Sequence, residues 1–147
     1  MLFVETYVAP SEVHGMGLFA AKKIPKGTKI WEFAPDFDLV LSEEDVQRLS
    51  EPCRERVLWY AYYNAERMRY ILCSDDARFM NHSNEPNTMS VGFGKKEGEG
   101  RTIAARDISP DEELTEDYMV FEEIGRNIRY GVSSAVTSLV AMERRVG

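Results

Sequence analysis

The sequence predicts a mainly β fold with a helical insert. Short runs of alternating, β-branched or aromatic residues recur in both halves of the chain, as in short strands. Between them, at about residues 42–66, the apolar spacing becomes helical and a capping signal comes first. A chain of 147 residues is long enough for one domain with a genuine core. We expect that domain over residues 1–120 and a C-terminal helical extension over residues 121–147.

Composition limits the classes of partner. The net charge is −7, the hydrophobic share 44% and the charged share 29%, which are ordinary values for a globular protein except for the acidity. Acidity argues against direct nucleic-acid binding and favours cationic partners. We see no signal peptide and no apolar run long enough to cross a bilayer, so the expected location is the cytoplasm, or the nucleus in a eukaryote. Cys53 and Cys73 are not in metal-ligand spacing, so no metal site is expected, while a single disulfide stays open.

The first third of the chain reads as strands and turns. Residues 2–8 resemble a strand ended by Pro10, residues 28–33 alternate as a strand does, and residues 38–41 allow another. Between the first two lies Gly15-Met16-Gly17, followed by an apolar run. Two glycines one residue apart fit a tight turn between strands, or a backbone that a ligand approaches closely.

The helical insert begins at Ser42, where a capping hydroxyl precedes three acids. Pro52 fits a second helix start, and the helical spacing continues through Ala61 and Tyr62. The aromatic residues at 59, 60, 62 and 63 are typical of a core, although phenols at the edge of a pocket could also contact a ligand. Residues 70–73 then read as a strand.

The stretch from Asp76 to Asn87 is the first candidate site. A short amphipathic piece runs into Asn81-His82-Ser83-Asn84, and polar side chains after a buried anchor need hydrogen-bond partners. A buried loop that recognises a polar ligand would use such residues. A capped turn explains the same residue types almost as well.

The second half repeats the pattern of strands and turns. Residues 88–93 and 101–106 read as strands, joined by a glycine-rich loop at 94–100 that we expect to be solvated. Residues 21–30 are echoed by residues 105–114, which predicts two similar corners in one fold. Residues 111–123 carry seven acids and no base, as a solvated charged face would, but Tyr118 stands out because it follows a strand. Apolar residues at helical intervals predict a terminal helix over 132–142.

Three motifs occur in order: Gly15-Met16-Gly17-Leu18-Phe19-Ala20, then the segment 78–87 with Asn81-His82-Ser83, then Glu113-Leu114-Thr115-x-Asp117-Tyr118. Together they resemble the SET-domain family of protein lysine methyltransferases over residues 3–120. The form is compact, without the cysteine-rich pre- and post-SET zinc modules. The resemblance implies a β-clip fold of small, mostly antiparallel sheets around a pseudoknot. There the C-terminal motif passes through a loop of the preceding chain and meets the Asn-His motif.

The resemblance also implies S-adenosylmethionine as cofactor and the side-chain amine of a lysine-bearing protein or peptide as substrate. Tyr118 would be the active-site phenol, and Glu116 and Asp117 would line the substrate channel. The implied cofactor-binding residues are Gly15, Met16, Gly17, Arg78, Asn81, His82 and, from the insert, Tyr60 or a neighbour.

Three positions depart from the family pattern. Asn84 stands where many relatives have cysteine, Asp111 replaces the usual turn glycine, and Glu116 stands where an aromatic residue often influences how many methyl groups are added. Glu116 leaves open a catalytically silent interaction module that still binds the cofactor. A small β-rich ligand-binding protein outside the family is the third option. The C-terminal helix would pack on the domain or on a second copy of the chain in a homodimer.

Overall fold

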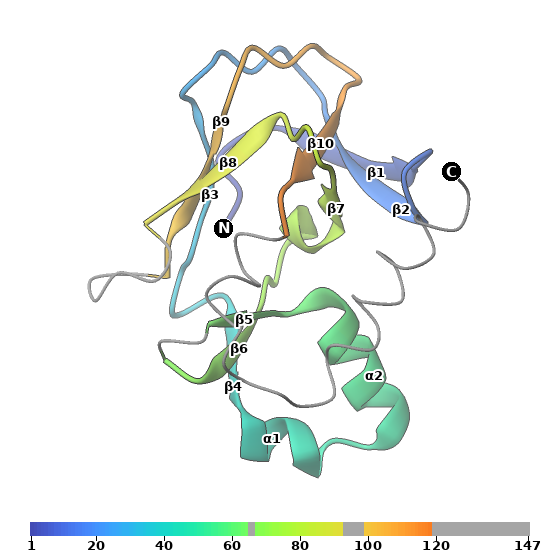
Figure 1. Ribbon diagram of the computed structural model, residues 1–147, viewed down its shortest axis with the longest axis vertical. Coiled ribbons are helices and arrows are strands. Elements are labelled where there is room, and N and C mark those ends of the chain that lie inside the picture. Colours follow the sequence, from blue (N-terminus) through green and yellow to red (C-terminus); the bar gives the residue numbers. More distant parts are fainter. Residues whose placement is uncertain (65–66, 93–98, 119–147) are drawn as a thin grey trace.

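The computed structural model describes residues 1–64, 67–92 and 99–118 (Figure 1). The predicted helix at 132–142 and its dimer contact lie outside this part. The elements in chain order are β1 (Thr6–Pro10), β2 (Met16–Ala20), β3 (Lys29–Glu32), β4 (Leu39–Ser42), α1 (Glu43–Arg48), α2 (Glu51–Tyr60), β5 (Tyr62–Asn64), β6 (Arg69–Leu72), the 3₁₀ helix η1 (Asp76–Phe79), β7 (Asn81–His82), β8 (Thr88–Val91), β9 (Arg101–Ala104) and β10 (Glu113–Glu116).

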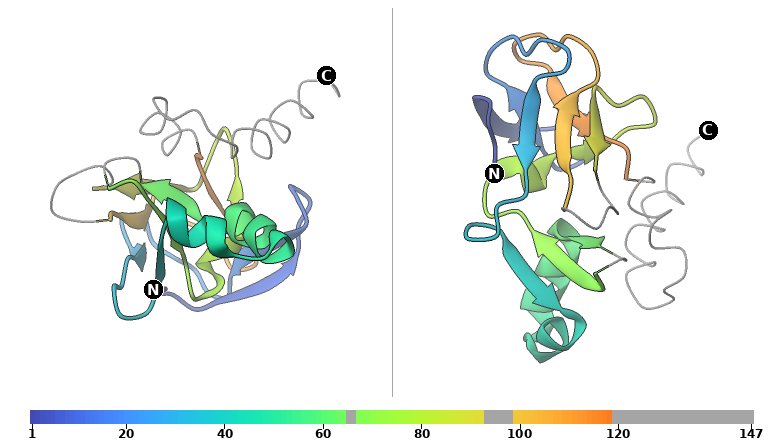
Figure 2. Two further views of the ribbon diagram at one scale, coloured as in Figure 1. Left: turned by 90° about the horizontal axis from the view of Figure 1, so that it is seen from below. Right: turned by 90° about the vertical axis from the view of Figure 1, so that its left-hand side faces the viewer.

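The strands form three small sheets, with orders β1-β2-β10-β7, β3-β9-β8 and β4-β6-β5. The predicted mainly β class with a helical insert is confirmed. The third sheet and the two helices form one end of the molecule, as Figures 1 and 2 show from three sides. Among the residues described, no helix has the length and apolar character needed to cross a bilayer.

β1 begins later than the sequence predicted. It spans Thr6–Pro10, and Leu2 instead forms an isolated bridge with Trp31. Pro10 is the last residue of the strand, in agreement with the predicted end. β1 is an edge strand, where a residue without an N–H group is tolerated.

The two echoed corners pair with each other. Ile24 and Ile108 exchange both backbone hydrogen bonds, each 2.9 Å long, and both side chains are buried. Gly27 and Asp111, which occupy equivalent places in the echo, both have positive φ, at 81° and 63°. Asp111 therefore accepts the left-handed conformation that favours glycine, and its side chain accepts a 2.9 Å hydrogen bond from the Tyr7 hydroxyl.

The insert starts as predicted and ends earlier. Ser42 and Asp45 form a capping box at α1, and α2 carries Pro52 in its first turn. The prediction that the helix continues through Tyr62 is wrong, since α2 ends at Tyr60. Tyr62 pairs in β5 with Ile71 of β6, and this long-range pairing suits an aromatic residue better than another helical turn.

The loop over 94–100 is not solvated throughout. Residues 93–98 lie outside the described part, but Glu99 is only 3% exposed. Its carboxylate accepts hydrogen bonds from Asn64 of β5 and Arg69 of β6. A buried carboxylate needs such partners, and this one attaches the end of the loop to the insert.

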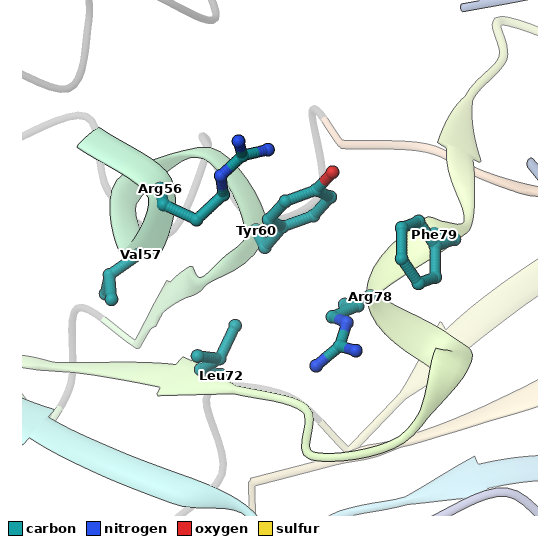
Figure 3. Close-up of a pocket in the computed structure, with 6 residues that line it drawn as sticks. All are labelled: Arg56, Val57, Tyr60, Leu72, Arg78 and Phe79. Atoms are coloured by element: carbon teal, nitrogen blue, oxygen red, sulfur yellow. The ribbon is translucent and has the colours of Figure 1, made fainter. Parts of the chain in front are cut away.

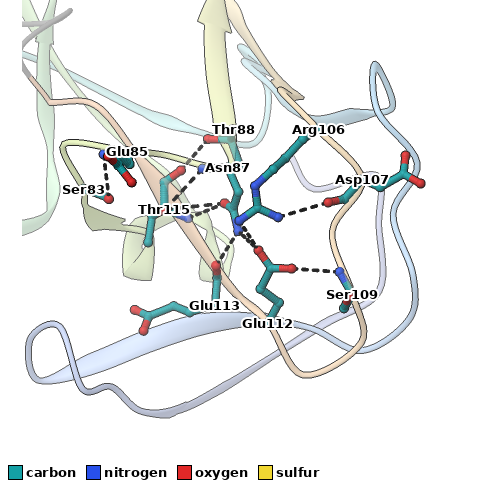
Figure 4. A network of polar contacts seen from close by, with 10 residues as sticks. All are labelled: Ser83, Glu85, Asn87, Thr88, Arg106, Asp107, Ser109, Glu112, Glu113 and Thr115. Atoms are coloured by element: carbon teal, nitrogen blue, oxygen red, sulfur yellow. Dashed lines mark hydrogen bonds and ion pairs between the residues drawn. The ribbon is translucent and has the colours of Figure 1, made fainter.

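Asn87 joins the start of β8 to β10. Asn87 is only 2% exposed. Its side-chain Oδ1 accepts a hydrogen bond from the Thr115 N–H at 2.9 Å, and its Nδ2 donates one to the Glu113 carbonyl at 2.7 Å (Figure 4). The amide thus satisfies two backbone groups that no neighbouring strand reaches on that side. The Thr88 hydroxyl adds a 2.8 Å bond to the Thr115 carbonyl.

We expect Asn87→Ala to lower the free energy of unfolding by about 2–4 kcal/mol, because it leaves two largely buried backbone groups without partners. Equilibrium urea unfolding measures this. Glu85→Ala, at an exposed position two residues before Asn87, is the control and should change stability by less than about 1 kcal/mol. Equal effects of the two variants would contradict the proposed role of Asn87.

Candidate functional site

Parallel pairing of β7 with β10 brings the second and third motifs together. Asn81 lies opposite Thr115 and His82 opposite Glu116, and the Ser83 N–H donates to the Glu116 carbonyl at 3.1 Å. β10 also pairs with β2, which carries Gly17. All three motifs therefore meet in one sheet, as the resemblance implied.

The Asn81 side chain binds the turn around Gly15 and Gly17, called the glycine loop below. Its Nδ2 lies 3.0 Å from the His14 carbonyl, 3.1 Å from the Met16 carbonyl and 2.8 Å from Oε1 of Glu113. The donors of this amide are thus used within the protein, and its backbone pairs with β10, which leaves Oδ1 for a ligand.

The two glycines have different roles. Gly15 has φ 51°, and a Cβ there would meet nothing within 4 Å, so the turn requires its backbone freedom. A Cβ on Gly17 would lie 2.7 Å from Cδ of Glu113 and 3.0 Å from Cβ of Ser11. On that side, the group that approaches Gly17 closely is therefore the Glu113 carboxylate, which also accepts hydrogen bonds from the Ser11 hydroxyl.

His82 positions the backbone of Tyr118. Its Nδ1 accepts from the Tyr118 N–H at 3.1 Å, so this nitrogen carries no proton, and the neutral ring has its proton on Nε2. Nε2 lies 3.3 Å from Oδ1 of Asn84. The residue that replaces the family's cysteine thus accepts from the ring and favours the tautomer that holds Tyr118.

The Tyr118 phenol is kept protonated. Its hydroxyl donates to the Met80 carbonyl at 2.5 Å. Burial raises the pKa of Tyr118 well above its usual value, and the charges of Glu116 and Glu113 add to the shift. At neutral pH this phenol is a hydrogen-bond donor and acceptor, not a base.

A pocket of about 330 Å³ lies between α2, β6 and η1 (Figure 3). It brings Tyr60 and Arg78, both implied by the resemblance, to one place. Arg56, one helical turn before Tyr60, adds a second guanidinium group. The remaining lining side chains are apolar: Val57, Leu72 and Phe79.

The pocket suits an anionic group on an otherwise apolar ligand. Within the described part of the chain, neither Arg56 nor Arg78 lies within 4 Å of a carboxylate. Their guanidinium groups instead lie 5.9 and 5.2 Å from the ring centroids of Tyr60 and Phe79. Two unpaired guanidinium groups beside one cavity in a protein of net charge −7 indicate an anion site. Sequence reasoning missed Arg56, although its i, i+4 spacing to Tyr60 was available.

The glycine loop reaches the helix that lines the pocket. The His14 ring lies 5.6 Å from the ring of Trp59, which directly precedes Tyr60. Tyr60 in turn makes an edge contact with Phe79 of η1, at 5.4 Å between ring centroids. These contacts join the glycine loop, the end of α2 and η1 on one side of the β7–β10 pair.

Glu116 is buried behind Tyr118. The residue is 7% exposed, and its Oε1 accepts from the hydroxyls of Ser90 on β8 and Thr102 on β9, the latter at 3.1 Å. Burial raises the pKa of Glu116, the two hydroxyl hydrogen bonds oppose the shift, and the charge of Asp117 adds to it. Asp117 itself is more exposed, with Oδ1 3.9 Å from Nδ1 of His82.

Tyr62 is a site residue that sequence reasoning placed in a helix. It lies in β5, packs edge-on against Trp31 and is close enough to Glu116 for that charge to affect it. Burial is the main cause that raises the pKa of Tyr62, with smaller contributions from Cys73, Asp38 and Glu116. Two phenols, those of Tyr62 and Tyr118, therefore lie within electrostatic reach of one buried carboxylate.

Metal ligation has no support in the ranges 1–64, 67–92 and 99–118, where no group of three or more histidine, cysteine or carboxylate side chains could hold an ion. Cys53 and Cys73 are both free, the first exposed and the second buried. The single disulfide that the sequence left open is therefore absent.

The stability of the protein should depend on Glu116 and pH. Because its folded-state pKa is raised, Glu116 stabilises the fold below the ordinary carboxyl pKa of ~4.3, and this contribution is lost as pH rises through the folded-state value. Glu116→Gln does not titrate, so its stability relative to wild type should rise between about pH 4 and pH 8. Urea unfolding across this range measures the difference, with the exposed Glu5→Gln as control. A difference that is constant with pH would contradict the shift.

Comparison with known proteins agrees with this geometry. The family model described as SET domain matches residues 15–119. A histone-lysine N-methyltransferase, H3 lysine-4 specific, of Chaetomium globosum is 33% identical over 135 residues, covering 82% of this chain and 11% of that protein. Human histone-lysine N-methyltransferase 2D is 31% identical over 116 residues, covering 76% of this chain and 2% of that protein.

The chain thus spans about a tenth or less of the length of these curated relatives. Among solved structures, a humanized mutant of the Chaetomium thermophilum Polycomb Repressive Complex 2, bound to an inhibitor, superposes with a TM-score of 0.61 at 22% identity. The superposition covers 84% of this chain and 16% of that one, and it supports the fold alone.

Proposed function

The chain belongs to the SET domain family of protein lysine methyltransferases, and from this premise we propose that it transfers methyl groups from S-adenosylmethionine to the side-chain amine of lysine in a protein. The observation that carries the proposal is the meeting of His82 and Tyr118 across the β7–β10 pair. The Tyr118 side chain there is half-buried and protonated, and the residue is held through both its backbone and its hydroxyl. We propose histones as the first substrates to test, because the named relatives act on histone lysines.

The residues of the pocket fit the cofactor. S-adenosylmethionine supplies, when bound, a methyl group that a sulfonium makes electrophilic. Arg56 and Arg78 would hold its carboxylate, and the rings of Tyr60 and Phe79 would cover its apolar part. The backbone of Gly15, Met16 and Gly17, together with Oδ1 of Asn81 and the backbone of His82, would bind the remaining polar atoms.

The chain's contribution to the reaction is positioning. Tyr118 would orient the lysine amine through its phenol oxygen, and holding two reactants in line contributes ~7–11 kcal/mol to rate acceleration. Since Tyr118 keeps its proton, it cannot remove the proton of the substrate ammonium. Glu116 and Asp117 would line the channel through which the lysine enters, and the acids around them would attract a basic peptide. The cytoplasm, or the nucleus of a eukaryotic cell, is the proposed compartment.

Isothermal titration calorimetry with S-adenosylmethionine tests the pocket. We expect Arg78→Ala and Arg56→Ala each to weaken binding by roughly tenfold, in keeping with a charge-assisted hydrogen bond worth about 1.5 kcal/mol. Arg54→Ala, on the same helix but outside the pocket, should leave binding unchanged. No binding to wild type would exclude the family's cofactor and, with it, the proposed activity.

Transfer of radiolabelled methyl groups to core histones and to a library of lysine-containing peptides tests the activity. Tyr118→Phe should bind the cofactor as wild type does but lower the rate by about 10²-fold or more, because the phenol oxygen that orients the amine is lost. Equal, near-zero incorporation by both proteins, with intact cofactor binding, would instead favour a silent interaction module.

A further inference from the structure

Three glutamates at or just before β10 are held in different ways. Glu112 accepts from Arg106, from Nδ2 of Asn87 and from the Ser109 N–H, and these bonds outweigh burial and lower its pKa (Figure 4). Glu113 accepts from Nδ2 of Asn81 and from the Ser11 hydroxyl. Glu116 alone of the three is held only by hydroxyl groups.

Hydroxyl partners suit a carboxylate that changes its protonation state. An N–H group can only donate, so it favours the ionised carboxylate. The hydroxyls of Ser90 and Thr102 can donate to a carboxylate or rotate and accept from a carboxylic acid. The contacts of Glu116 therefore stay satisfied whether or not it carries a proton.

Glu116 also lacks a counter-charge. No lysine, arginine or histidine nitrogen of the described residues lies within 4 Å of its carboxylate, although the residue is only 7% exposed. The groups that face it are neutral or acidic: Tyr62 of β5, Cys73 after β6, the hydroxyls of β8 and β9, and Asp117 and Tyr118 on its own segment. A buried anion in such surroundings is costly until it meets a cation or takes up a proton.

We propose that Glu116 accepts the proton that the substrate lysine must lose before it can be methylated. This inference rests on the proposed function and assigns a step that Tyr118 cannot perform. The ammonium R–NH₃⁺ and the Glu116 carboxylate become the amine R–NH₂ and the Glu116 carboxylic acid. The freed lone pair then attacks the methyl group, and the sulfonium leaves as a thioether.

The size of the effect follows from the lysine side chain. With an unperturbed pKa of ~10.4, roughly one lysine amine in a thousand is neutral at about pH 7.5. A base placed inside the site reduces this limit by accepting the proton directly, and positioned bases contribute about 10²–10⁴-fold to rates. A carboxylate whose proton affinity is raised by burial is better matched to this task than an exposed one.

The test compares pH–rate profiles of wild type, Glu116→Gln and Glu116→Asp, on the best peptide from the methyl-transfer assay. Glu116→Gln is nearly isosteric and can still accept from both hydroxyls, so it should fold. We expect its kcat/KM to fall by about 10²-fold at pH 7.5 and to recover toward wild type at about pH 10, where the free amine is abundant. Glu116→Asp should keep the wild-type shape of the profile at a lower rate, and the exposed Glu5→Gln should match wild type.

Different results would contradict the role of Glu116 and the proposed function. A Glu116→Gln profile parallel to that of wild type, whether lower or equal, would overturn the role of Glu116 and leave the proposed function standing. An inactive wild type would overturn both. The pH dependence of unfolding gives a readout without turnover. A stability difference between wild type and Glu116→Gln that stays constant from pH 4 to pH 8 would mean that Glu116 takes up no proton there, and would also overturn the inference.

Discussion

The structure depends on one short parallel pairing, that of β7 with β10. It sets Asn81 opposite Thr115 and His82 opposite Glu116, and it leaves Tyr118 two residues beyond the paired region. A pairing this short has few backbone hydrogen bonds, and side chains add further hydrogen bonds on both sides of it. Asn87 bonds to the backbone of Glu113 and Thr115 on one side, and Asn81 joins β7 to the glycine loop on the other. Asn81 and Asn87, whose residue type is typical of turns, thus supply hydrogen bonds that a neighbouring strand would otherwise provide.

The positively and negatively charged side chains lie in different parts of the site. The pocket between α2 and η1 holds two guanidinium groups with no carboxylate near them among the described residues, while Glu116 is a carboxylate with no cation. The arrangement of Glu116 is unfavourable in isolation, because a buried carboxylate without a cation loses its hydration, whereas Arg56 is exposed to solvent. Opposite charges could have been paired to raise stability, and their separation is typical of a site that receives a ligand with charges at two places.

Local patterns predicted the strands, the Ser42 cap and the equivalence of the two corners. They did so because these features depend on neighbours in sequence. The meeting of His82 with Tyr118 came from the resemblance alone, since general rules of topology disfavour threaded chains. Tyr62, Glu99 and Arg56 were misjudged or missed for a common reason. Each depends on residues distant in the chain. Tyr62 pairs with β6, Glu99 is buried against Asn64 and Arg69, and Arg56 lies beside Arg78.

The paired corners bear on how the chain acquires its structure. Ile24 pairs with Ile108, and β2 pairs with β10, so β2 has only β1 beside it until residues 108–116 have been synthesised. Contacts over such separations are slow to form, and an incomplete sheet exposes an unpaired edge in the meantime. Nascent chains would therefore be open to aggregation or chaperone capture, and a truncation before residue 108 would remove β10, the partner of both β2 and β7.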